Sequence, residues 1–274
     1  MGIKGLQEKI EAIRYHDART NDFQINCFGD EIVVYFDNYD EYGAEDGRGW
    51  KVSFLICNKV SYETDASWVW NKGHVTAHTR GDFVKNMTQG QLCFYGQHII
   101  LSEADDFIIV EMDLICLNVN FQCKEIEIEK IDNSEMNFFW KNNVLVPPSR
   151  SKFPKVNVKK LQKKINKICF DEKRVSVFQI NYFGDEVDVY LDNEDGTWWK
   201  VSFLICDNVS YETNRKNHHV RNMTKDQLSY CCQGIILSEV GDFTSVKMDL
   251  TIMTVNLQCK LIEISSVKTI KAKK

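Results

Sequence analysis

Hydrophobic positions in this chain follow two periods, one helical and one typical of strands. Ile3, Leu6, Ile10 and Ile13 fall on one face of a helix. From residue 21 onward, apolar and polar residues alternate in short runs separated by turn-forming residues such as Gly29-Asp30. Many short strands with turns between them predict an antiparallel β-sandwich or barrel, with the helix covering an edge or an open end. We therefore expect a mainly β fold of the α+β class.

The sequence contains an internal repeat. The segment Trp50–Thr64, WKVSFLICNKVSYET, returns as Trp199–Thr213, WKVSFLICDNVSYET, with two of fifteen letters changed. The helical stripe also returns, at Val158, Leu161, Ile165 and Ile168. A repeat of this length indicates a duplicated domain rather than a solenoid unit. We expect two tandem homologous β-sandwich or barrel domains, each preceded by a short amphipathic helix: residues 1–130, a proline-containing linker at 131–157, and residues 158–274.

Charge and cysteine content argue against several classes of function. The net charge of −5 argues against a nucleic-acid binder, which needs a clustered positive surface. No apolar run approaches the roughly 20 residues of a membrane span. The ten cysteines show neither a CxxC pair nor zinc spacing, and no signal peptide is visible. We therefore expect a cytoplasmic protein, with Cys57, Cys123, Cys206 and Cys259 reduced and buried.

No catalytic or cofactor-binding motif is present, so we expect no enzyme activity, no cofactor and no metal. His74 and His78 have the spacing of helical metal ligands, but they lie in an irregular, glycine-containing segment. Most carboxylates shared by the repeats are explained as turn formers or solvent-facing strand residues. A carboxylate-based hydrolase would need two of them, for example Glu103 and Asp113, to face each other in a cleft.

The repeats differ in length in two loops, at residues 39–49 and 65–83. Loops on a rigid scaffold are common places for binding specificity, and exposed tryptophans suit binding hot spots. Alternatively, the tryptophans fold back over the open end of the first domain. The candidate partner-binding residues are Tyr39, Asp40 and Tyr42 in the first loop, and Trp68, Trp70, His74, His78 and Arg80 in the second.

The shared strings WKVSFLIC, VSYET, NMT-x-x-QL and ILSE resemble a family of small proteins from bacterial polymorphic-toxin immunity gene clusters. This resemblance implies a non-enzymatic module that neutralises a toxin-like protein partner by steric and electrostatic occlusion. An acidic protein would complement a basic toxin. A β-sandwich that binds carbohydrate or another small ligand, a carboxylate-based hydrolase and a purely structural duplicated scaffold remain the alternatives.

Overall fold

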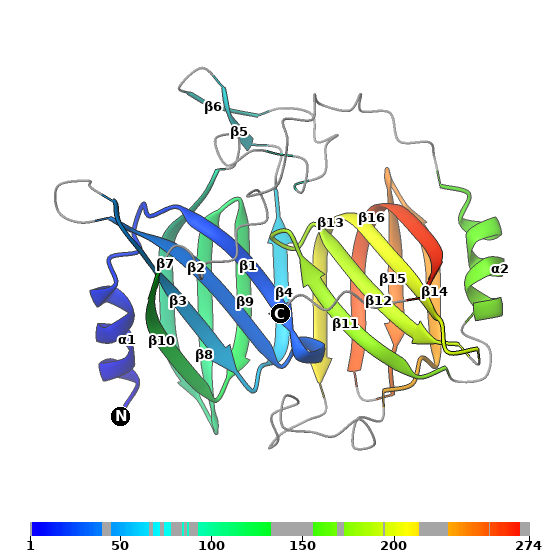
Figure 1. Cartoon of the computed structure of the whole chain (residues 1–274), viewed down its shortest axis with the longest axis horizontal. Helices are drawn as coiled ribbons and strands as arrows, with labels where there is room; N and C mark the ends of the chain where they lie inside the picture. Colours follow the sequence, from blue (N-terminus) through cyan, green and yellow to red (C-terminus); the bar gives the residue numbers. More distant parts are fainter. Residues whose placement is uncertain are drawn as a thin grey trace.

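The computed structural model of the chain is mainly β, which confirms the fold class that the alternating pattern predicts (Figure 1). It describes residues 2–39, 45–65, 68–71, 74–77, 84, 87, 93–132, 156–168, 173–193, 195–213, 230–251 and 253–268. The two expected helices are confirmed as α1 (Ile3–Ala12) and α2 (Val158–Ile168). Most of the expected linker, residues 133–155, lies outside the described residues.

The strands of the first repeat precede α2, and those of the second repeat follow it. In the first repeat they are β1 (Thr20–Asn26), β2 (Glu31–Tyr39), β3 (Glu45–Leu55), β4 (Asn58–Thr64), β5 (Trp68–Asn71), β6 (His74–Ala77), β7 (Phe94–Ala104), β8 (Phe107–Ile115), β9 (Leu117–Cys123) and β10 (Glu125–Asp132). In the second they are β11 (Val175–Asn181), β12 (Glu186–Asp192), β13 (Trp198–Thr213), β14 (Gly234–Val240), β15 (Phe243–Asp249) and β16 (Met253–Val267). The long strands β13 and β16 each take the place of two first-repeat strands, β3 with β4 and β9 with β10.

Fourteen of these strands form one antiparallel sheet, which is not closed into a barrel, while β5 and β6 form a separate hairpin. The sheet has two layers, because β13 and β16 continue from one layer into the other (Figure 1). The first layer has the order β10-β3-β2-β1-β11-β12, followed by the first half of β13 and the second half of β16. The second layer has the order β7-β8-β9-β4, followed by the second half of β13, the first half of β16, β15 and β14.

The repeats join in both layers through strand pairs that link corresponding positions. In the first layer β1 pairs with β11 at Ile25 and Ile180, which occupy the same position in their repeats. In the second layer Ser61 of β4 pairs with Ser210 of β13, again at matching positions. Such pairing of like with like is what a two-fold axis between the repeats produces. The structure therefore differs from the expected separate sandwiches, since strands that would be edges in one repeat alone are paired with the other repeat.

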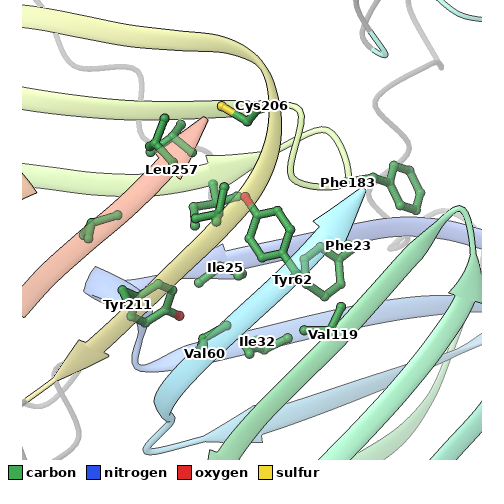
Figure 2. Close-up of a cluster of buried hydrophobic side chains, with 14 of the residues drawn as sticks. Phe23, Ile25, Ile32, Val60, Tyr62, Val119, Phe183, Cys206, Tyr211 and Leu257 are labelled. Carbon is green, nitrogen blue, oxygen red and sulfur yellow. The ribbon is translucent and has the colours of Figure 1, made fainter. Parts of the chain in front are cut away.

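Two tyrosines bind the repeats to each other across this axis (Figure 2). The hydroxyl of Tyr62 donates a hydrogen bond to the carbonyl of Gly184 at 3.1 Å. The hydroxyl of Tyr211, the corresponding residue, donates to the carbonyl of Gly29 at 3.0 Å. Both tyrosines are buried, and each spans from one repeat to a turn of the other.

Two pairs of stacked aromatic rings also join one repeat to the other. Phe183 stacks on Phe94 of the first repeat, with 4.0 Å between ring centroids. The corresponding Phe28 stacks on Tyr230 of the second repeat, with 4.2 Å between centroids. All four rings belong to a single buried cluster that runs through both repeats. The hydrophobic core is therefore shared rather than divided.

Each helix covers the outer edge of the second layer. Gln7 of α1 donates from Nε2 to the carbonyl of Ile99 at 2.9 Å, and its Oε1 accepts the Leu101 N–H at 2.8 Å. Gln162 of α2 makes the same two bonds to β14, each at 2.7 Å. An amide side chain thus takes the place of the neighbouring strand that β7 and β14 lack. The expectation that a helix covers an edge is confirmed.

The four cysteines expected to be buried belong to the hydrophobic core. Cys57, Cys123, Cys206 and Cys259 are buried and free, as the sequence predicts. Burial raises the pKa of Cys123 and of Cys259 to about 12, so both thiols stay protonated near neutral pH. In the described ranges, neither helix has the length or the apolar run that crossing a bilayer needs.

Candidate functional site

The outer face of the second layer is exposed and polar at its centre. Strand β4 alternates strictly between buried and exposed residues and exposes Lys59, Ser61 and Glu63. Strand β9 alternates in the same way and exposes Asn118 and Asn120. Because successive residues of a strand point to opposite faces, these side chains share the face that is turned away from the core.

Eight side chains form one row across this face, four from each repeat. Residues directly opposite each other on neighbouring strands lie on the same face of a sheet. We call this set the cross-repeat row; at about 4.8 Å between strands it extends roughly 34 Å. From β7 to β14, its members are Ile100, Glu111, Asn120, Ser61, Ser210, Asn256, Lys247 and Ile236.

The row has nearly the same chemistry in both halves. Two serines meet at the centre, an asparagine follows on each side, and an isoleucine stands at each end. The two terminal isoleucines, Ile100 and Ile236, are 49% and 63% exposed. Large exposed aliphatic side chains at matching positions suit contact with another molecule better than contact with water. Only Glu111 and Lys247 break the symmetry, so the first half is the more acidic.

Two adjoining pockets hollow this face. The larger has a volume of about 460 Å³ and lies over the centre of the row, with Glu63, Asn118, Asn208 and Gln258 among its lining. The second, of about 360 Å³, shares Glu63 and Asn118 with the first and extends to Asp65. Asp65 follows the end of β4, where the chain continues toward the β5–β6 hairpin. A continuous hollow therefore leads from the row toward this hairpin.

Uncharged hydrogen-bonding groups dominate the centre of the face. Serine and asparagine side chains provide adaptable hydrogen bonds in protein-binding surfaces. Within the described residues, no group of three His, Cys, Asp or Glu side chains could hold a metal ion. The carboxylates expected for a hydrolase are far apart, because Glu103 pairs with Ile108 while Asp113 pairs with His98. Five residues of strand, or roughly 17 Å, separate those two pairings. The arrangement suits binding, and it supports no hydrolase at this pair.

A cluster of buried charged residues on the outer face of the first layer contributes to the stability of the fold. Lys200 lies 2.9 Å from Asp188 and 3.4 Å from Glu186. Ser202 donates a hydrogen bond to Asp188 at 2.6 Å. Burial, together with the neighbouring Glu186, raises the pKa of Asp188, while Lys200 and Ser202 act against that rise. One lysine therefore compensates two buried carboxylates.

Replacing this lysine is expected to destabilise the fold. Lys200→Met removes the cation 2.9 Å from the buried carboxylate of Asp188, which costs about 3–5 kcal/mol of the free energy of unfolding at pH 7. Asp188 already has a raised folded-state pKa, and without Lys200 this pKa rises further. A group of this kind stabilises the fold below its unfolded pKa, and this contribution is lost as pH rises through the folded pKa. Urea unfolding should therefore show a smaller defect at pH 4 than at pH 7.

The first repeat offers a matched control. Lys51 occupies the position of Lys200, but it pairs with Glu129, which is 52% exposed, at 3.2 Å. The first-repeat residue that corresponds to Asp188 is Val33, which is apolar. Lys51→Met should therefore cost at most about 1 kcal/mol. Equal losses in the two variants would show that burial of the carboxylates is not the cause.

The residues predicted to bind a partner are distributed over separate elements. Trp68 and Trp70 lie on β5, His74 lies on β6, and Tyr39 ends β2. Residues 65–83, interpreted from the sequence as a loop without periodicity, contain a hairpin in which Asn71 pairs with His74. Because His74 is in a strand, the helical spacing suggested for a metal site is not formed there. The remaining candidates, Asp40, Tyr42, His78 and Arg80, lie outside the described residues.

Sequence reasoning missed the cross-repeat row. Its serines and asparagines were visible only as the solvent-facing positions of alternating strands. The available signal was their recurrence: Ser61 returns as Ser210 and Asn120 returns as Asn256. That recurrence gains meaning only once β4 and β13 are known to pair, because this pairing places both copies in one line.

Comparison with known proteins agrees with a binding role. Comparison with curated proteins finds no match. A family model described as "Immunity protein PIM7" matches residues 2–130 and 157–266, nearly the extent of the two repeats. Immunity proteins neutralise a cognate toxin, which is the function that the resemblance implied. Since the two matches together span most of the chain, this protein belongs to the PIM7 family of immunity proteins.

Proposed function

We propose that the protein neutralises its cognate toxin by binding it, without catalysis, and that the cross-repeat row is the centre of the contact. The observation that carries this proposal is the register of the row, which places eight outward side chains from both repeats in one line. A bound toxin would be occluded sterically by the whole width of the second layer.

The size and rigidity of the cross-repeat row support its role as a protein-binding surface. A row of roughly 34 Å on strands of about 20 Å gives an area on the order of 700 Å². Each partner in a standard protein complex buries about 800 Å². The row stands on paired strands rather than on loops, so little conformational entropy is lost when a partner binds. Ile100 and Ile236 would act as apolar anchors around a polar centre.

The β5–β6 hairpin is proposed as the second part of the contact. The two adjoining pockets lead from the row toward it, and β5 carries Trp68 and Trp70. Tryptophan is enriched among residues that dominate binding energy. The net charge of −5 would favour a basic toxin through faster, oriented association.

We propose further that the two repeats arose by duplication of one unit, residues 1–130 and 158–274. The near-identical segments at Trp50–Thr64 and Trp199–Thr213 support this proposal. The matched hydrogen bonds of Tyr62 and Tyr211 do so as well.

A carbohydrate-binding role fits the geometry less well. Such sites usually place an aromatic ring against the sugar. Tyr62 is the one aromatic residue among the described lining of the larger pocket, and it is 2% exposed. Its hydroxyl is already bound to the carbonyl of Gly184.

Enlarging the centre of the row is expected to abolish protection. Asn120→Arg combined with Asn256→Arg places two long cations on exposed strand positions, where folding changes by no more than about 0.5 kcal/mol. Affinity for the cognate toxin domain should fall at least about 100-fold, or about 2.7 kcal/mol. Calorimetry with the purified toxin domain measures the affinity, and growth of bacteria that co-express the toxin measures protection.

The control changes charge equally on the opposite layer. Glu127→Gln with Glu263→Gln, on exposed corresponding positions of β10 and β16, raises the net charge by the same two units. This pair should bind the toxin like the parent protein. A third variant, in which Asn214–His219 replaces residues 66–83, measures the contribution of the hairpin to the affinity for the toxin. Full affinity in the double arginine variant would remove the row from the proposal, and full affinity in the third variant would remove the hairpin.

A further inference from the structure

A groove with an apolar floor and a basic rim lies along α2. It has a volume of about 500 Å³ and is bounded by α2 and the second half of β16. Its floor is formed by Val156, Leu161, Leu261 and Ile262. Its rim carries four lysines of α2, Lys160, Lys163, Lys164 and Lys167. This groove shares no residue with the cross-repeat row.

The first repeat has different residues at the corresponding positions. Lys160, Lys163 and Lys167 correspond to Gly5, Glu8 and Ala12 of α1, as the shared Leu6/Leu161 alignment shows. Leu261 of the floor corresponds to Glu125. Lys164 alone is kept, as Lys9. The second repeat therefore has a basic rim over an apolar floor, whereas the first has one lysine and one glutamate at the rim positions and a glutamate in the floor. The scaffold of the repeat does not require the lysines.

The lysines also disfavour the helix that carries them. Lys160 and Lys164 are four residues apart, as are Lys163 and Lys167, and like charges at this spacing destabilise a helix by about 0.2–0.5 kcal/mol per pair. Within the part of the chain that the structure describes, these four lysines form no ion pair. Lys164 donates a hydrogen bond to the carbonyl of Ile264 at 3.3 Å, which leaves its charge uncompensated.

We propose that this groove binds an acidic amphipathic segment of a protein partner. Aliphatic side chains of that segment would cover Leu161 and Leu261, and its carboxylates would pair with the lysines of the rim. Charge complementarity selects an acidic occupant, and the apolar floor selects one that also carries aliphatic residues. This second surface is independent of the proposed toxin contact, since it lies on other residues.

Fluorescence anisotropy with labelled peptides tests the proposal on the full chain. The probe is a 14-residue peptide with glutamates and leucines at helical spacing, and the comparison peptide has serine in place of each leucine. The parent protein should bind the probe at least tenfold more tightly than the comparison peptide. Lys160→Gln, Lys163→Glu and Lys167→Ala together should weaken binding of the probe at least tenfold. Equal affinity for the two peptides, or for the two proteins, would overturn the proposal.

Two further arms separate the groove from general charge effects. Leu261→Gln makes the floor polar without changing the net charge, keeps all four lysines, and should also weaken binding of the probe at least tenfold. Co-sedimentation with phosphatidylglycerol vesicles should show little retention at physiological salt. Strong retention that depends on the same lysines would assign the groove to a membrane surface and reject a protein segment. Circular dichroism at 222 nm checks that each variant keeps its helix.

Discussion

Separate expression of residues 1–132 and 156–274 is expected to yield neither half as a stable monomer. In the intact chain, three aromatic side chains of each half contact a carbonyl or ring of the other half. Exposure of such side chains costs about 1.5–3 kcal/mol each, or roughly 5–9 kcal/mol for each half. That loss is comparable with the whole stability of a typical domain, about 5–15 kcal/mol. β1 and β4 would also become unpaired edges.

Co-expression should restore a 1:1 complex, because the contacts described between the halves are hydrogen bonds, strand pairs and packed rings rather than covalent bonds. Size-exclusion chromatography with light scattering distinguishes the expected aggregates or dimers of one half from the restored complex. As a control, a protease site placed within residues 133–155 and cleaved after folding should leave one particle of unchanged size. A single half that elutes as a monomer and unfolds cooperatively would show that the shared core is dispensable.

Substitution at Gly184, where the two repeats meet, should destabilise the fold. Gly184 has φ of +83°, and a Cβ built there would lie 2.4 Å from Cε2 of Tyr62. The left-handed conformation costs a residue with a side chain about 1–2 kcal/mol. Overpacking against the ring adds about 1–3 kcal/mol. Gly184→Ala should therefore lower the free energy of unfolding by roughly 2–5 kcal/mol, as measured by urea titration.

Gly196 separates these two costs. Its φ is +76°, but no atom lies within 4 Å of a Cβ placed there. Gly196→Ala should cost only the conformational part, about 1–2 kcal/mol. In a Tyr62→Val background the additional cost of Gly184→Ala should fall, and the double-mutant cycle measures the coupling. If Gly184→Ala were no more destabilising than Gly196→Ala, the close approach of Tyr62 would have no energetic weight.

Local patterns predicted the local elements because those elements depend on nearby residues. The stripe of Ile3, Leu6 and Ile10 predicted α1, and the alternating pattern from Lys59 to Thr64 predicted β4. Partner choice between strands was not predictable, since Ser61 and Ser210 stand in nearly identical segments. Either copy offers the same backbone groups and the same apolar face, so one sequence pattern fits pairing within a repeat and pairing between repeats.

The functional surface was harder to predict for the same reason. Asn120 alternates with buried neighbours, as any solvent-facing strand residue does. Its alignment with Asn256 depends on two strand pairs and on the contact between β4 and β13. The hairpin β5–β6 was missed because its strands have four residues each, too few for a period to be recognised.

The glutamines at the outer edges of the second layer protect those edges from pairing with another molecule. A chain whose halves join by strand pairing carries a form of contact that could in principle continue from molecule to molecule as a fibre. Gln7 hydrogen-bonds the C=O of Ile99 and the N–H of Leu101, which no neighbouring strand in the described ranges pairs with. Gln162 makes the same two bonds at the corresponding positions of β14. Further copies find no open hydrogen-bonding groups at those points. The side chains of two glutamines thereby close both outer edges of the second layer to strand addition at these positions.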